Sequence, residues 1–325
     1  MFDTHHDLLS IAYKAYLTGD YSYLKKMSDD INENNVKGVI ANLYFMKPDE
    51  MSFELCEDYY KENVSVLDMF IKAKEVLDTY IPDVDFIYSI EGADYIKNED
   101  ELEALYNAGL DALILCWNNE NKYGSGNRSD KGLTKEGAKL INKAIDLGMG
   151  IDLSHANKNT FYDLCDLIQY RKNKGDDVCC YASHSNSRAL CDRDRNLDDS
   201  QLKRIKDING LVGVFALKNF TILPDDDNKN YKDVFLRHIE HIKKIVGDFN
   251  VMVASDNMDF CLDRDESYFE SSIYNYSNIS KKLYKDLERK FGYVQAYFIL
   301  YENAKDKIFD KLKTNRYNNR IGDVK

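Results

Sequence analysis

The stretches Met149-Gly150-Ile151-Asp152-Leu153-Ser154-His155 and Cys179-Cys180-Tyr181-Ala182-Ser183-His184 are short apolar runs that both end on Ser-His. Each is too short for a helix, and turn-forming residues precede it, so both are predicted to be strands. Residues 157–175 between them predict a helix capped by Asn159. A strand-helix-strand unit makes the two strands parallel neighbours, so His155 and His184 should share the carboxyl edge of one sheet.

The rest of the chain repeats this alternation of strands and helices. Further strands are predicted at residues 2–7, 37–45, 83–91, 110–117, 210–217 and 249–256, and helices at 8–17, 51–80, 134–147 and 231–246. The irregular aromatic segment 263–278 suggests a loop over the barrel mouth. No linker rich in Pro, Gly or Ser interrupts the pattern. The prediction is an α/β fold, a single (β/α)8 TIM-type barrel over residues 1–325, with extra helices from about 279 packed outside.

Composition limits the classes of partner. The chain has 325 residues, 44% of them hydrophobic, and a net charge of -12 without a basic stripe. This disfavours nucleic-acid and anionic-membrane partners. Neither a signal-like start nor an apolar run of roughly 20 residues stands out, and the seven cysteines form no Cys-x-x-Cys pair, so we expect reduced thiols and a cytoplasmic location.

Metal-binding residue types gather at the predicted strand ends: His5, Asp7, Glu91, His155, His184 and Asp256. His5 and Asp7 are two apart in a strand, so both can point at one ion. A glutamate from a nearby strand, Glu91, could bridge that ion to a second one held by His155 and His184. Two metals about 3.5 to 4 Å apart would share a hydroxide and deliver it to a polarised carbonyl or phosphoryl group.

Each of these residues also has a structural interpretation. A histidine after serine can be a hydrogen-bonded loop residue, and Glu91 before Gly92 can belong to a turn. Four of the six histidines nevertheless fall at strand ends, which favours a metal site. His6 points opposite to His5 and should be structural, whereas His238 and His241 lie on a predicted helix and should be solvated.

Several segments together resemble the renal, or membrane, dipeptidase family, which consists of zinc peptidases on an amidohydrolase-like barrel. The resemblance follows the family's order almost from end to end. It rests on Asp3-Thr4-His5-His6-Asp7-Leu8, Ser89-Ile90-Glu91-Gly92, residues 132–137, 147–155 and 183–190, Arg193-Asp194-Arg195-Asn196-Leu197, residues 209–214 and Ala254-Ser255-Asp256.

This resemblance implies a role for each site residue. His5 and Asp7 would hold one zinc ion, His155 and His184 a second, and Glu91 would bridge them. Arg195 would bind the terminal carboxylate of a dipeptide. Asp256 would move a proton from the nucleophile to the leaving amine, although Asp259 is an alternative because the spacing of Ser255-Asp256-Asn257-Met258-Asp259 departs from the family's Asp-x-Asp-Gly.

Trp117 is a second departure, because many dipeptidases have a histidine there that polarises the scissile carbonyl. An indole offers one neutral donor, so Trp117 either marks a branch with different substrates or walls the pocket. The resemblance implies a metallo-dipeptidase with two zinc ions that hydrolyses small dipeptides, D-residues at the second position included, and forms a homodimer. The alternatives are a related zinc amidohydrolase acting on a non-peptide amide and a non-catalytic peptide-binding protein.

Overall fold

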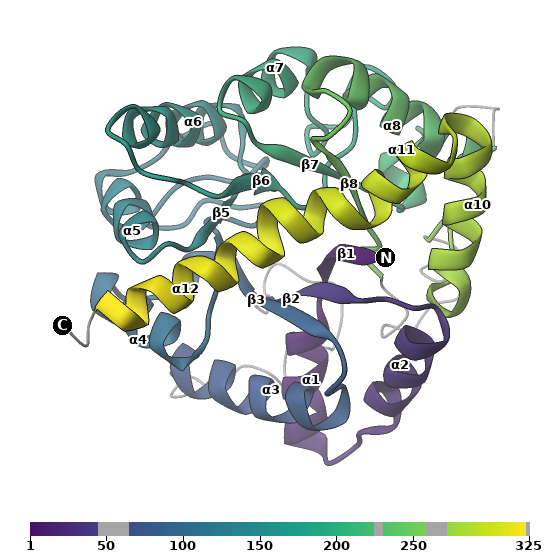
Figure 1. Ribbon diagram of the computed structural model, residues 1–325. Coiled ribbons are helices and arrows are strands. Elements are labelled where there is room, and N and C mark those ends of the chain that lie inside the picture. The colour runs from purple at the N-terminus through teal and green to yellow at the C-terminus, as the bar shows by residue number, and fades with distance from the viewer. Residues whose placement is uncertain (45–64, 224–229, 258–271, 323–325) are drawn as a thin grey trace.

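The computed structural model describes residues 1–44, 65–223, 230–257 and 272–322, and within them eight parallel strands form a ring (Figure 1). The strands pair in chain order, each with the next. They are β1 (Phe2–His6), β2 (Gly38–Tyr44), β3 (Asp85–Glu91), β4 (Ala112–Ile114), β5 (Gly150–Asp152), β6 (Cys180–Ala182), β7 (Leu211–Phe215) and β8 (Val251–Ala254).

Hydrogen bonds at the end of β8 close the ring onto β1. Ser255 donates its backbone N–H to Oδ1 of Asp3 at 2.8 Å, and Asp256 donates its own to the carbonyl of His5 at 3.1 Å. The side chains of Asp3 and Ser255 are both buried, so the contact between β8 and β1 lies inside the protein. The predicted (β/α)8 barrel is confirmed, and all eight predicted strands are present, although several are much shorter than predicted: β4, for example, has three of the eight residues predicted at 110–117.

Helices surround the barrel between successive strands. They are α1 (Leu8–Thr18), α2 (Ser22–Glu33), α3 (Val66–Tyr80), α4 (Glu99–Ala108), α5 (Lys135–Asp146), α6 (Lys158–Asn173), α7 (Asp199–Asp207) and α8 (Tyr231–Val246). The sequence predicted α1, α5, α6 and α8, and also α3, for which residues 51–64 of the predicted range lie outside the described residues. The N-cap of α6 is Asn157 rather than the predicted Asn159, since the Asn157 side chain accepts from the Thr160 N–H.

Three of these helices, α2, α4 and α7, were not predicted from the sequence, and polar residues make up at least half of each. α2 buries Leu24, Met27 and Ile31, a spacing of three and four that is typical of one helix face. α7 begins with a capping box formed by Asp198 and Gln201. Both signals are readable in the sequence, but they are short.

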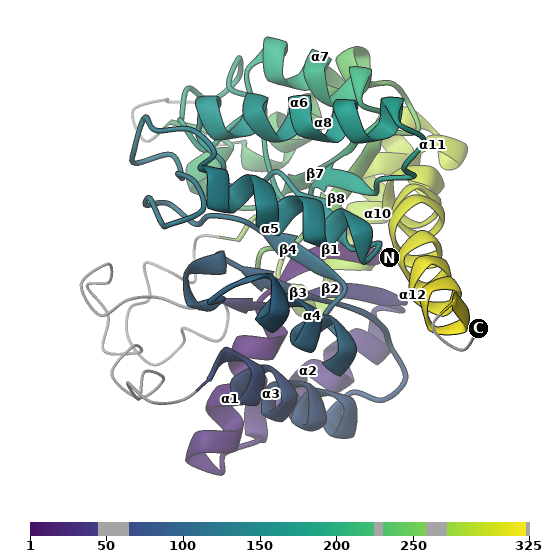
Figure 2. The same cartoon turned by 90° about the vertical axis from the view of Figure 1, so that its left-hand side faces the viewer.

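The C-terminal helices take two positions. α10 (Ile279–Phe291) lies beside α8 in the ring around the barrel. The barrel end opposite the strands' carboxyl ends is crossed by α11 (Tyr293–Tyr297), the π-helical segments Phe298–Glu302 and Lys305–Asp310, and α12 (Lys311–Gly322). Phe309 and Leu312 pack into the barrel interior with Phe2, Ile40 and Leu211. Figures 1 and 2 show α12 crossing this end, which leaves the carboxyl end of the strands for a site.

The aromatic segment 263–278, predicted to be a loop over the barrel mouth, is described only from residue 272, and residues 263–271 lie outside the described residues. Tyr274 and Tyr276 are both buried, and Tyr276 packs edge-on against His6. These two are therefore core residues rather than part of an open loop.

The five described cysteines are buried and unpaired, as expected for reduced thiols. Within the described part of the chain, no helix is both long and apolar enough to cross a membrane.

Candidate active site

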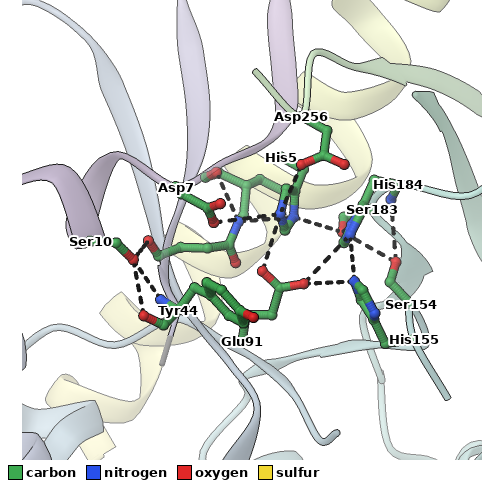
Figure 3. A network of polar contacts seen from close by, with 12 residues as sticks. His5, Asp7, Ser10, Tyr44, Glu91, Ser154, His155, Ser183, His184 and Asp256 are labelled. Atoms are coloured by element: carbon green, nitrogen blue, oxygen red, sulfur yellow. Dashed lines mark hydrogen bonds and ion pairs between the residues drawn. The ribbon is translucent and has the colours of Figure 1, made fainter. Parts of the chain in front are cut away.

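Six predicted site residues lie at the carboxyl ends of five strands. His5 is in β1 and Asp7 directly after it, and Glu91 is the last residue of β3. His155, His184 and Asp256 follow β5, β6 and β8 within three residues. Parallel strands end at one rim, so residues up to 251 positions apart meet (Figure 3). His155 and Asp256 have φ of 65° and 44°, an uncommon backbone conformation that turns their side chains toward the cluster.

Glu91 stands between the histidines. Its Oε2 lies 3.3 Å from Nε2 of His5, whereas its Oε1 lies 2.8 Å from Nε2 of His155 and 3.5 Å from Nε2 of His184. The two carboxylate oxygens thus face two different groups of imidazoles. Such an arrangement suits a carboxylate that bridges two ions.

Asp7 and Asp256 complete the side of the cluster around His5. Nε2 of His5 lies 3.7 Å from Oδ1 of Asp7 and 3.9 Å from Oδ1 of Asp256. Potential ligand atoms of His5, Glu91 and His184 lie within 4.8 Å of one another, and the same holds for His5, Asp7 and Asp256. Asp256 therefore belongs to the cluster, while Asp259 lies outside the described residues.

The donor set fits divalent metal ions. Oδ1 of Asp7 is buried and has no hydrogen-bond donor among the described residues. Nε2 of His155 and Nε2 of His184 face each other at 2.9 Å, although both atoms also point at Glu91. Imidazole nitrogens and carboxylate oxygens are the ligands of zinc and similar ions. Buried polar atoms converging without donors of their own are what such ions would satisfy.

Burial and neighbouring charges shift the pKa of His5 upward and those of His155 and His184 downward. Burial alone would lower the pKa of His5, but the charges of Glu91, Asp256 and Asp7 outweigh burial and raise it to about 10. Burial and the charge of Arg195 lower the pKa of His155 to about 4. Burial and the charge of His5 hold the pKa of His184 well below its ordinary value. His155 and His184 are thus neutral at pH 7, the form that binds a metal, whereas His5 would have to release its proton when an ion binds among the surrounding carboxylates.

Arg195 is buried at the same rim. Its guanidinium donates to the carbonyl of His184 at 2.7 Å and to Oγ of Ser185 at 3.0 Å, and it lies over the ring of Phe215. Arg195 forms no ion pair with a described carboxylate, so its charge is free to meet an anion. Burial lowers its pKa to about 10, which still leaves it charged at pH 7.

Trp117 stands beside the cluster on the loop after β4. Its ring centroid lies 6.1 Å from that of His155 and 5.0 Å from that of Tyr44, and the guanidinium of the exposed Arg128 lies over the indole, 5.7 Å from its centroid. The indole thus packs beside a residue of the cluster. This placement agrees with a wall of the site.

The other histidines divide differently from the prediction. His6 is buried away from the cluster, as expected of a structural residue. The expectation of a solvated His238 is wrong: its side chain is fully buried, with Nδ1 3.0 Å from the backbone N of Ser187 and Nε2 2.9 Å from the carbonyl of Thr221. His241, one turn further along α8, is partly exposed and pairs with Asp199.

Sequence reasoning missed the polar residues behind the histidines. Asn118 places Oδ1 3.1 Å from Nδ1 of His155, and Asn42 and Ser183 contact the rings of His5 and His184. The available signal was a polar side chain inside an apolar strand, as with Asn42 in β2 or Asp152 in β5. That signal is weak, because such residues occur in many strands.

A TIM barrel that gathers histidines and carboxylates at this rim has the architecture of a metal-dependent hydrolase. The sequence model of the membrane dipeptidase family, peptidase family M19, matches residues 51–285. The chain belongs to this family, and the resemblance seen in the sequence is confirmed. His5 and Asp7 precede the matched range, so their assignment to the site depends on geometry.

Individual relatives cover less of the sequence. An uncharacterized protein in the PQQ-III 3' region of Acinetobacter calcoaceticus is 34% identical over 170 residues, 48% of this chain and 50% of that protein. An uncharacterized dipeptidase of Schizosaccharomyces pombe is 28% identical over 196 residues, 59% of this chain and 45% of its own length. The chain thus spans about half the length of these curated relatives.

Solved structures share the fold over nearly the whole chain. A metallopeptidase from Rhodobacter sphaeroides, crystallised with a phosphinate mimic of the dipeptide L-Ala-D-Ala, has a TM-score of 0.69 at 20% identity and covers 96% of this chain and 98% of its own. The probable dipeptidase PvdM from Pseudomonas aeruginosa has a TM-score of 0.66 at 14% identity, covering 89% of this chain and 88% of its own.

Proposed function

We propose that this protein is a metallo-dipeptidase that hydrolyses the peptide bond of small dipeptides. The observation that carries the proposal is the position of Glu91, whose two oxygens face His5 on one side and His155 with His184 on the other. His5 and Asp7 would hold one divalent ion, zinc in our proposal, His155 and His184 the other, and Glu91 both. Bound metal ions would supply an activated water at neutral pH and polarise the carbonyl.

The protein's own residues would bind and orient the dipeptide. Arg195, charged and without a carboxylate partner, suits the substrate's terminal carboxylate. The side chain of Asp256 is 16% exposed, more than those of Asp7 (9%) and Glu91 (4%), so of these three carboxylates it is the most accessible from the mouth. In our proposal Asp256 would bind the substrate's amino group and pass a proton to the leaving amine. Fixed charges at both ends would select dipeptides over longer peptides.

The phosphinate mimic bound by the Rhodobacter sphaeroides metallopeptidase supports including a D-residue at the second position among the substrates. A panel of L,L and L,D dipeptides, assayed with the zinc-loaded protein, tests the proposal. We expect turnover that is abolished by a chelator and by His184→Ala but retained by His241→Ala, whose side chain pairs with Asp199 outside the cluster. Absence of turnover across the panel would contradict it.

The wall formed by Trp117 favours a second candidate, a related amidohydrolase acting on a non-peptide amide. An indole beside His155 gives the site a large flat surface where a histidine would give a titratable donor. Hydrolysis of N-acyl or cyclic amides without hydrolysis of dipeptides would identify this activity. The cytoplasmic location, the homodimer and the single-domain organisation stay predictions.

A further inference from the structure

The three imidazoles of the cluster all turn Nε2 toward Glu91 (Figure 3). Each of them turns Nδ1 toward a polar side chain. His155 has its own partner, because Nδ1 lies 3.1 Å from Oδ1 of Asn118. His5 and His184 share one, since Oγ of Ser183 lies 2.8 Å from Nδ1 of His184 and 3.4 Å from Nδ1 of His5. In the proposed function, these two histidines bind different ions.

The chemistry of the ring decides the direction of these contacts. A neutral imidazole that gives its Nε2 lone pair to a metal carries its proton on Nδ1, so Nδ1 must donate. Asn42 also faces this ring, with its amide nitrogen Nδ2 3.0 Å from Nδ1 of His5. Because Nδ2 is a donor, this amide can accept the ring proton only if it turns its buried and otherwise unpartnered Oδ1 toward the ring. The hydroxyl of Ser183 is the acceptor that already faces His5.

Ser183 can accept both protons, because a hydroxyl oxygen has two lone pairs and one proton of its own. That proton is left for Ser154, whose Oγ lies 3.3 Å away. Oγ of Ser154 also accepts the backbone N–H of His184 at 3.2 Å. The hydroxyl of Ser183 can therefore be fully satisfied while both imidazoles donate to it.

The surrounding backbone fixes Ser183 in place. Its N–H donates to Oδ1 of Asp152 at 3.0 Å, and the N–H of Ser154 donates to the same oxygen at 2.9 Å. Its carbonyl accepts from Oγ1 of Thr4 in β1 at 2.8 Å. Gly213 leaves room for this contact, since a Cβ there would lie 1.8 Å from that carbonyl oxygen. Ser183 is 0% exposed, so no water competes from bulk solvent.

We infer that Ser183 is a positioning residue shared by both halves of the metal centre, where its hydroxyl holds His5 and His184 with Nε2 directed at their ions. The inference rests on the proposed assignment of these histidines to two ions. Ser183 would not bind an ion itself. Because its one hydroxyl contacts a ligand of each ion, its loss should weaken the binding of both. Asn118, by contrast, acts on His155 alone.

Titration of the metal-free protein with Zn²⁺ in competition with a chromogenic chelator tests this inference without an activity assay. Wild type should bind two ions. Ser183→Ala should weaken both dissociation constants about 10- to 100-fold, the usual effect of losing a group behind a metal ligand. Asn118→Ala should weaken one, and Ser183→Thr, which keeps the hydroxyl, should recover much of the loss.

Ser187→Ala is the matched control, because it removes a buried serine hydroxyl that has no hydrogen-bond partner among the described residues. Its zinc affinities should stay closer to wild type. In the zinc-loaded protein labelled with ¹⁵N-histidine, Ser183→Ala should shift two ring Nδ1–H signals and speed their exchange, a change that loss of packing alone would not confine to two rings. If Ser183→Ala folds and binds both ions as wild type does, or weakens only one, the inference is wrong. Two bound zinc ions without dipeptide turnover would instead overturn the proposed function.

Discussion

Nε2 of His155 lies 2.9 Å from Nε2 of His184, deep in the rim of the barrel. Burial is the largest cause of the low pKa of each ring, so both are uncharged at pH 7. Only one of the two Nε2 atoms can donate to the other, and both compete for Oε1 of Glu91. A shared metal ion removes this competition, because each nitrogen then offers a lone pair to the same cation.

Zinc should therefore stabilise the fold measurably. A ligand that binds only the folded state at 100 times its dissociation constant adds about 2.7 kcal/mol. We expect the melting temperature to fall by several degrees after chelation and to recover when Zn²⁺ is restored. His184→Ala should lose most of this response, whereas His241→Ala should keep it. Identical melting curves with and without zinc would contradict a metal centre in this cluster.

The guanidinium of Arg195 should bind the terminal carboxylate of the dipeptide. Replacing its planar guanidinium by the single ammonium of Arg195→Lys removes a bidentate partner for a carboxylate, which we expect to lower kcat/KM for dipeptides by about 10- to 100-fold. A dipeptide with an amidated C-terminus lacks that carboxylate, so its already slow hydrolysis should change little. Zinc content measured in parallel shows whether the His184 carbonyl, which Arg195 also contacts, was disturbed. An equal loss for both substrates would argue against carboxylate binding.

The sequence was sufficient to predict the barrel because its strands are almost entirely buried and most of them are short, largely apolar runs bounded by turn-forming residues. β5 and β6 each have three residues in the described structure, yet the apolar residues around Ile151 and Tyr181 make them visible. The polar helix α7 buries only Gln201, Leu202 and Ile205, too few for a clear periodic signal.

The site could be predicted only in part. His5 and Asp7 are visible because alternation in a strand puts them on one side. The contacts of Ser183 and Asn118 depend on backbone turns, such as the positive φ of His155, that no local pattern encodes. His238 was misjudged because its helix has a mixed polar face, and the backbone groups that satisfy it come from loops 51 and 17 residues away.

His238 makes stability depend on pH. Burial is the main cause that lowers its pKa from 6.5 to about 4, so the unfolded chain takes up this proton at a higher pH than the folded chain. The stability that depends on a neutral His238 is therefore fully present above about pH 6.5 and is lost as the pH falls toward 4. This difference in pKa between the folded and the unfolded chain corresponds to roughly 3 kcal/mol in the free energy of unfolding.

Urea unfolding at pH 7 and pH 4.5 tests this expectation. His238→Gln keeps a donor for the Thr221 carbonyl but cannot be protonated. The variant should be less stable than wild type at pH 7 and should lose less stability on acidification. Parallel pH profiles for the two proteins would show that His238 does not cause the loss.

Arg316 lies on α12, the helix that covers the barrel end opposite the strands' carboxyl ends. Its guanidinium donates to Oδ1 of Asp111 at 2.8 Å and to the carbonyls of Tyr106 and Leu110, and it lies 4.2 Å from the Tyr106 ring centroid. The side chains of Arg316 and Asp111 are 15% and 11% exposed, so Arg316→Ala leaves a nearly buried carboxylate without its cation.

We expect Arg316→Ala to lower the free energy of unfolding by about 3 kcal/mol, as for other broken buried pairs. Lys313 on the same helix is the matched control, because its pair with Asp85 is 45% and 57% exposed. Lys313→Ala should cost less than about 1 kcal/mol. Zinc affinity should be unchanged in both variants, since this helix lies at the opposite end of the barrel from His5 and Glu91. Equal losses of stability in the two variants would mean that burial of the Arg316 pair adds nothing beyond an exposed ion pair.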